Sequence, residues 1–349
     1  MKLLVPICLF LFCQFVSIGQ DTVKITANNH TILKVDEKTM HLSSKGKGTH
    51  IGEKAGIATP DTDHWNTMVG FESGTQTSSG ISNAYFGAFT GRNNNNGSGN
   101  TFIGSVAGRD NTGSNNTFIG TAAGRLSAGG FHNNFFGANA GSNNSGGHNI
   151  SIGHFAGQFG NGHNNIAIGR NSLPNIENRS DLIAIGDSSL YTNGQGAFLG
   201  SQGIRNTAVG TKTLKKNQRG SNNSAFGYLA SEANRLGGNN SSFGSFALNA
   251  NSDGTGNSAF GTLALSNTII GNLNTAVGSE AGRFATGSQN TFIGYKSGSD
   301  NTNGNGNVFL GYRAGENSIG SNQLMIHNSA TNNPLLHGFF DSTKLVING

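Results

Sequence analysis

Four histidines are the first residues whose type and spacing suggest chemistry. His132 and His148 each stand five residues before a glycine of a recurring pattern, and His154 and His163 follow nearby. If successive repeats stack as strands, the first two imidazoles come within roughly 5 Å of each other. Imidazole is a common zinc ligand. We interpret these histidines as polar turn residues near a rim, and we predict no metal site and no cofactor.

A second set of side chains is basic. Several arginines follow a glycine of the same pattern, and one denser basic segment lies later in the chain. Such a column predicts a site for an anionic ligand, such as an acidic glycan or a matrix polymer. The alternative is that the charges are solvated and keep neighbouring edges from aggregating. The candidates are Arg92, Arg109, Arg125, Lys212, Lys215, Lys216, Arg219 and Arg283.

Catalytic signatures do not stand out. No Ser/His/Asp, Cys/His or paired-carboxylate arrangement recurs, and the glycines lie between strand-like segments rather than in a phosphate-binding loop. A calcium-binding nonapeptide needs a regular Asp, whereas only isolated cases such as Asp253-Gly254 occur. We therefore predict that the chain is not an enzyme.

Composition narrows the fold. Gly accounts for 55 of 349 residues, Pro for 4 and charged residues for 11%, with a net charge of +5. So much Gly disfavours a helical bundle. The scarcity of Pro and the lack of a three-residue Gly period exclude collagen. The small net charge and the 23 Phe argue against a disordered tail.

A repeat supplies the elements that must position these side chains. Segments like Asn100–Gly104 recur seventeen times, spaced 16 to 18 residues apart except for 14 and 10 around Gly200. Each reads as a short strand, with Thr101 and Ile103 on one face and Phe102 on the other. Stacked in register, the repeats predict an all-β parallel solenoid with a buried column of Ile103-type side chains. We expect a bulge or a shortened coil between Pro174 and Gly210.

Asparagine occupies the position four before the glycine in fourteen repeats. Stacked Asn side chains can form hydrogen bonds along a ladder, so we expect one here. The face opposite Ile103 carries large aromatic residues, which would make an unusually large apolar patch if exposed to solvent. We predict that it lies between chains of a homotrimer. The interface candidates are Tyr85, Phe102, Phe118, Phe135, Phe198, Phe292 and Phe309.

The two ends differ from the repeats. Residues 1–19 combine a charged start with a short apolar run, which is typical of a cleaved signal peptide. Residues 20–48 predict capping strands before the repeat region, 49–315. Residues 316–349 are expected to be a C-terminal cap or a connector to a missing stalk. The protein is then secreted or held at the cell surface, with no membrane span in the mature chain.

The repeat Asn290-Thr291-Phe292-Ile293-Gly294, with Gly298 after it, resembles the head repeats of trimeric autotransporter adhesins of the YadA type. It is still more similar to repeats of tail-fibre-like proteins of Bacteroidota. The resemblance covers about residues 49–315. It implies a left-handed parallel β-roll, with three chains side by side presenting a binding surface. The repeat is longer than that of the adhesin heads, and nothing resembles their membrane-anchoring barrel.

These observations predict an exported, non-enzymatic structural and adhesive protein. Its expected partners are copies of itself and an extracellular glycan or matrix protein, and not nucleic acid. One alternative is a purely structural fibre segment. The other is a solenoid that binds ice or a polymer surface through ranked threonines. Those threonines are Thr101, Thr117, Thr207, Thr275 and Thr291.

Overall fold

The computed structural model describes residues 24–25, 33–34, 41–43, 47–60, 64–331 and 333–348. Its regular elements are all strands, and no helix occurs among the described residues. The chain divides into two compact units, residues 1–148 and 149–349. The predicted signal segment 1–19 lies outside the described residues, as does most of the predicted cap 20–48.

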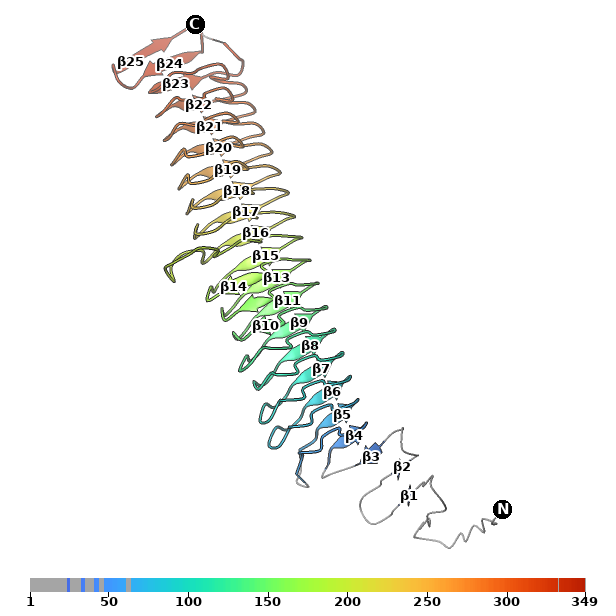
Figure 1. Cartoon of the computed structure of the whole chain (residues 1–349). Helices are drawn as coiled ribbons and strands as arrows, with labels where there is room; N and C mark the ends of the chain where they lie inside the picture. Colours follow the sequence, from blue (N-terminus) through green and yellow to red (C-terminus); the bar gives the residue numbers. More distant parts are fainter. Residues whose placement is uncertain are drawn as a thin grey trace. The chain divides into compact units, whose positions relative to one another are not determined.

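In the first unit, six three-residue strands stack in parallel and in register (Figure 1). The parallel stack begins at β4, because the preceding β3 pairs with it antiparallel, and β1 and β2 pair antiparallel before that. A short β10 (Asn143–Asn144) follows the last coil. The strands before it are β1 (Lys24–Ile25), β2 (Leu33–Lys34), β3 (His41–Ser43), β4 (Thr49–Ile51), β5 (Thr67–Val69), β6 (Ala84–Phe86), β7 (Thr101–Ile103), β8 (Thr117–Ile119) and β9 (Asn134–Phe136).

The second unit repeats the arrangement. Ten three-residue strands and β23 (Gln323–Ile326) stack in parallel, and β24 (Leu336–Phe339) and β25 (Lys344–Ile347) then add antiparallel. A small second sheet pairs β12 (Phe159–Gly160) with β14 (Asn175–Glu177). The ten are β11 (Ile150–Ile152), β13 (Ile166–Ile168), β15 (Ile183–Ile185), β16 (Thr207–Val209), β17 (Ser224–Phe226), β18 (Ser241–Phe243), β19 (Ser258–Phe260), β20 (Thr275–Val277), β21 (Thr291–Ile293) and β22 (Val308–Leu310).

The predicted parallel β-solenoid is confirmed, with about 16 turns rather than seventeen. The repeat assigned to Gly200 does not form a strand of the stack. Ile183–Ile185 pairs directly with Thr207–Val209, so the coil between them is lengthened and not shortened. Its extra residues leave the stack as a loop, which Figure 1 shows projecting between β15 and β16.

The two faces of each strand are the reverse of the prediction. Phe102 is fully buried inside the coil, whereas Ile103 is 39% exposed. The same pattern, with the middle residue buried, holds in every strand of both stacks from β4 to β22. Both faces carry apolar residues, so alternation alone could not say which one points inward. The inward aromatic rings stack at centroid distances of 4.7–5.1 Å from Tyr85 through Phe135. Burial raises the pKa of the Tyr85 phenol well above its usual range.

The glycine that ends each strand lets the next coil approach. Gly104 has φ +129°, and a Cβ built on it would lie 2.6 Å from the carbonyl oxygen of Gly120 in the following coil. Such a contact excludes any side chain. The recurrence of this glycine therefore reflects the distance between coils and not a need for flexibility.

The predicted asparagine ladder is present and buried. The backbone N–H of Asn100 donates to Asn83 Oδ1 at 2.9 Å, and Asn100 Oδ1 accepts the N–H of Asn116 at 2.9 Å. Asn100 Nδ2 also donates to the carbonyl oxygen of Gly113 at 2.9 Å. Each amide thus joins neighbouring coils at two points. In the second unit, Leu182 interrupts the ladder but still donates its N–H to Asn165 Oδ1.

A second buried amide ladder was not predicted. Asn217, Asn234 and Asn251 each donate from Nδ2 to the Oδ1 of the preceding member, starting from Asn193, at 2.6–2.8 Å. All four are essentially inaccessible to solvent. They stand seven residues after the strand-ending glycine, a recurrence that the sequence contains.

The interior of each coil is narrow and is shared by two residues, the inward strand residue and the residue six positions later. Where one of them is large, the other is small. Where the inward strand residue is large, a glycine stands six residues later: a Cβ on Gly108 would lie 2.5 Å from the Phe102 ring. Where the inward residue is small, that position often holds leucine, as in the pair Ala259 and Leu265, both fully buried. Leu265 has φ +49°, so its packing offsets a left-handed backbone that is costly for leucine.

This inverse relation in size predicts strong coupling between the two positions. Phe102→Ala should cost about 3–5 kcal/mol through the cavity it leaves, and Gly108→Leu should also destabilise because it meets the ring. The double variant Phe102→Ala/Gly108→Leu recreates the natural Ala259 and Leu265 pair. We expect it to be more stable than the sum of the single effects by about 1–3 kcal/mol. A double-mutant cycle from urea unfolding measures this coupling free energy. Additive effects of the two substitutions would contradict the inverse relation between the sizes of the two residues.

The ladder generates a second prediction. Asn100→Ala removes a buried donor and acceptor and leaves the Asn116 N–H and the Gly113 carbonyl without their partner, which should cost about 2–4 kcal/mol. Asn96→Ala is the matched control in the same coil, because Asn96 is exposed and is not left-handed. We expect the control to change the unfolding free energy by less than about 0.5 kcal/mol. Equal losses in the two variants would show that the ladder adds nothing to stability.

Candidate functional site

The residues predicted to form an interface between chains lie mostly inside one chain. Tyr85, Phe102, Phe118, Phe135, Phe292 and Phe309 are each 0% exposed. The interface assignment is therefore wrong for these six. They fill the coil interior, where a partner chain cannot reach them. The seventh, Phe198, is 83% exposed but lies in the projecting loop and not in a strand.

The projecting loop, residues 194–203, is held in place by two arginines. Its ends meet where Asn193 Nδ2 donates to the Gly203 carbonyl at 2.7 Å. Arg219 Nε donates to the Gly196 carbonyl at 2.8 Å, and its guanidinium carbon lies 4.8 Å from the centroid of the Phe198 ring. Arg179 Nη2 donates to the Ala197 carbonyl at 3.3 Å. The loop thus presents an aromatic tip on a fixed base.

Half of the eight residues in the predicted basic column are paired with neighbouring carboxylates. Arg92 pairs with Glu72 at 2.9 Å, Arg109 with Asp110 at 2.6 Å, Arg283 with Glu280 at 2.9 Å and Lys216 with Glu232 at 3.3 Å. Arg219 instead contacts the projecting loop, through the Gly196 carbonyl and the Phe198 ring. Within the described residues, Arg125, Lys212 and Lys215 form no ion pair. An anionic-ligand site therefore stays a prediction that rests on these three residues.

His132 and His148 stand at equivalent positions of neighbouring coils, as predicted. Their rings stack with centroids 5.0 Å apart and an interplanar angle of 25°, and Phe131 contacts both rings edge-on. Asn115 Nδ2 lies 3.5 Å from His132 Nε2. Among the described residues, no group of three or more His, Cys, Asp or Glu side chains could hold a metal ion.

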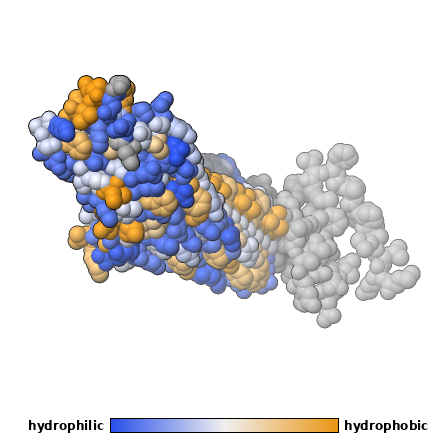
Figure 2. Space-filling model, turned by 90° about the horizontal axis from the view of Figure 1, so that it is seen from above, coloured by the Kyte–Doolittle hydropathy of each residue, from blue (hydrophilic) through white to orange (hydrophobic). Residues whose placement is uncertain are grey.

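The surface that sequence reasoning missed is the outward strand face. The residue before each strand-ending glycine points outward from every strand of both stacks, and none of these side chains is buried. Phe86, Ile293 and Leu310 are among the exposed members. Phe226, Phe243 and Phe260 stack at 4.7 and 5.0 Å along this face in the second unit. Apolar residues lie exposed among hydrophilic ones on the surface in Figure 2.

A second outward column runs beside the apolar one. It holds the first residue of each strand, which is most often Thr or Ser. The threonines singled out above, Thr101 and Thr117 in the first unit and Thr207, Thr275 and Thr291 in the second, all lie in it and are half-buried. The outward face of each unit is thus a polar column next to an apolar column, repeated once per coil. One signal in the sequence could have identified this face. Along both stacks from β4 to β22, the middle residue of each strand is large only where glycine stands six residues later and is small where leucine stands there, which indicates that the middle residue points inward and its two neighbours outward.

The structure shows no helix among the described residues that is long and apolar enough to cross a membrane. In comparisons with known proteins, no family model, no curated protein and no solved structure matches this chain.

Proposed function

We propose that this chain is an exported, non-enzymatic structural and adhesive protein that associates as a homotrimer through its outward strand face. The observation that carries the proposal is the apolar column on that face. It recurs in every coil of both stacks and leaves side chains such as Phe86 and Leu310 about 41% exposed. The resemblance to the head repeats of trimeric adhesins supports an assembly of three chains.

An apolar column is costly to leave in water. Monomeric proteins seldom expose contiguous apolar patches of more than a few hundred Å², whereas this column has one member in every coil. Association of copies would bury it. A flat column of Ile, Val and Phe flanked by Thr and Ser also has the apolar centre and polar rim of ordinary protein interfaces.

The remaining surface would serve attachment. Turns rich in Asn, Ser and Thr repeat along each unit, and copies held side by side would present them several times over. Multivalent display raises the avidity of individually weak contacts without any new contact. Such a surface suits adhesion better than tight binding of one small ligand.

Light scattering on purified residues 20–349 tests the assembly. We expect a mass three times that of one chain, and a shift to monomer for Ile103→Asp/Val277→Asp, because each charge would be buried in the interface. Ile57→Asp is the control: Ile57 is 59% exposed but lies outside the outward strand face. Circular dichroism should show that all three proteins are folded. A folded, monomeric wild-type chain would end the homotrimer proposal.

The outward face also favours a second candidate function, binding to ice or to a regular polymer surface. Threonines share this face with exposed Ile and Val, and neighbouring ranks stand one strand spacing apart. The rank is interrupted, however, by Asn134 in the first unit and by Ile150, Ile166 and Ile183 in the second. The two functions compete, because a face buried between chains cannot contact a lattice.

An ice-recrystallisation assay separates the two candidates. We expect the wild-type protein to leave crystal growth unchanged at micromolar concentration, since its Thr face is buried in the assembly. Inhibition that disappears in Thr207→Glu/Thr275→Glu, but persists in the exposed-surface control Thr302→Glu, would replace adhesion by the lattice-binding function.

A further inference from the structure

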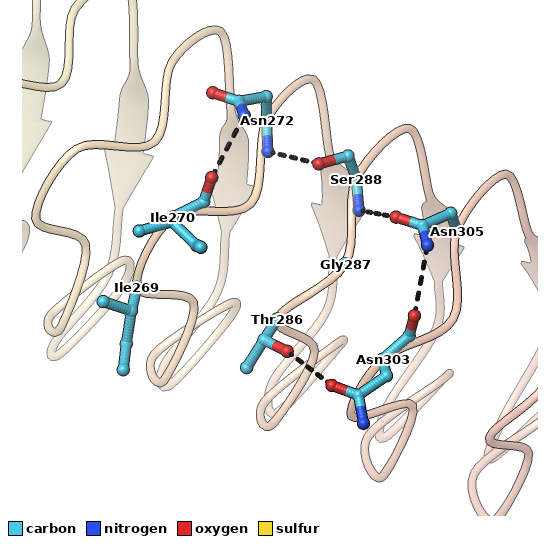
Figure 3. Close-up of a pocket in the computed structure, with 8 residues that line it drawn as sticks. All are labelled: Ile269, Ile270, Asn272, Thr286, Gly287, Ser288, Asn303 and Asn305. Carbon is cyan, nitrogen blue, oxygen red and sulfur yellow. Dashed lines mark hydrogen bonds between the residues drawn. The ribbon is translucent and has the colours of Figure 1, made fainter.

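A shallow groove of about 610 Å³ crosses the turns of three successive coils in the second unit. Figure 3 shows its side chains in two rows. Asn272, Ser288 and Asn305 form the first row. The second row is formed by Ile269, Thr286 and Asn303. The groove therefore runs across the strands, and each coil contributes one polar side chain to the first row.

The floor of the groove is backbone. Gly287 lies at its centre, and a Cβ built there would be 2.1 Å from the carbonyl oxygen of Gly304 in the next coil. The close approach of the coils excludes any side chain at this position. Gly287 is only half-buried, so a ligand can reach the backbone between the two rows.

The first row is fixed by its own hydrogen bonds. The backbone N–H of Asn272 donates to Ser288 Oγ at 3.0 Å, and the N–H of Ser288 donates to Asn305 Oδ1 at 2.7 Å. Ser288 Oγ is used here as an acceptor, and its own O–H has no acceptor among the described residues. The row thus holds a hydroxyl donor in a fixed position, which lowers the entropy cost of binding.

The second row combines apolar and polar groups. Ile269 and Ile270 are 52% and 63% exposed at one end. Thr286 and Asn303 follow; the threonine hydroxyl donates to the Thr302 carbonyl and also lies 3.3 Å from Asn303 Oδ1. The Nδ2 of Asn303 donates to no described residue. An exposed apolar platform therefore lies beside uncommitted amide and hydroxyl donors.

The chemistry of the lining selects against charged ligands. The eight lining residues are Ile, Asn, Thr, Gly and Ser, and none is ionisable. Neutral amides and hydroxyls beside an apolar platform match a sugar, whose hydroxyls form hydrogen bonds while its C–H face packs on apolar side chains. An extended β-linked polysaccharide advances per sugar by roughly 5 Å, close to the distance between neighbouring strands. Successive sugars would then meet successive coils.

We propose that this groove binds an uncharged, extended, β-linked polysaccharide, one sugar to a coil. The inference rests on the proposed adhesive function and deepens it by naming the class of ligand. It assigns contact with the sugar faces to Ile270, and hydrogen bonds with the sugar hydroxyls to Ser288 and Asn303.

Cellohexaose, an uncharged β-1,4-linked hexasaccharide, is the probe for a calorimetric or NMR titration of residues 20–349. We expect weak binding, with a dissociation constant of about 1 mM, and no binding of maltohexaose, which has the same composition but coils. Ile270→Ser should weaken binding roughly five- to tenfold through lost apolar contact. Leu236→Ser is the matched control, because Leu236 is an exposed residue at the same position of another coil.

A second pair separates direct contact from damage to the turn. Ser288→Ala removes the free hydroxyl donor and the acceptor for the Asn272 N–H. Ser98→Ala removes the equivalent acceptor, for the Ile81 N–H, outside the groove. We expect only Ser288→Ala to weaken binding of cellohexaose.

Three results would overturn the inference: no binding of cellohexaose at about ten times the expected constant, equal binding of maltohexaose, or equal losses in groove and control variants. Light scattering on the same sample keeps the two proposals separate. A trimer that does not bind the sugar would reject the groove alone, and a monomer that binds it would reject the assembly alone.

Discussion

Neighbouring strands of this solenoid lie roughly 4.8 Å apart, and that distance limits which residues each coil can carry. Each coil must stack on the next at that distance around its whole circumference. Gly104 is glycine because the carbonyl of the following coil lies where a Cβ would stand. The buried side-chain amide of Asn100 spans the same gap: its Oδ1 accepts the Asn116 N–H and its Nδ2 donates to the Gly113 carbonyl, both at 2.9 Å. Inward rings stack at 4.7–5.1 Å for the same reason.

A coil this small encloses little volume, and the way it is filled explains its unusual backbone. One strand residue and one turn residue share the interior, so a phenylalanine demands a glycine and an alanine accommodates a leucine. Many turn residues adopt left-handed conformations, including bulky ones such as Phe89 and Leu265. Each costs about 1–2 kcal/mol in isolation. Ladder hydrogen bonds and buried contacts, repeated in every coil, offset that cost and leave little freedom in the inward positions.

Function is consequently confined to positions that stacking leaves free. The outward strand face, the turns and the loop 194–203 are such positions, and they differ in character. The strand face is apolar and regular, which suits contact with another regular surface. The turns are polar, and most of their charges are paired within the chain, as in Arg92 with Glu72. The groove around Gly287 is lined by neutral turn residues, so it is suited to a neutral ligand rather than an ionic one.

The parallel stacking, the coil length and the asparagine ladder can be predicted from the repeat alone, because glycine, asparagine and apolar residues recur at fixed spacing wherever coils must approach. It did not determine which strand face points inward. Phe102 and Ile103 are both apolar, and a period of two fits either choice equally well. The inward face was decided only when the coil closed, because the Phe102 ring fits against Gly108 in the interior. The folded chain also places the residues around Gly200 outside the stack, and half of the eight basic residues predicted as ligands bind neighbouring carboxylates. The loop and the pairs Arg92–Glu72 and Lys216–Glu232 depend on contacts between coils that no single repeat contains.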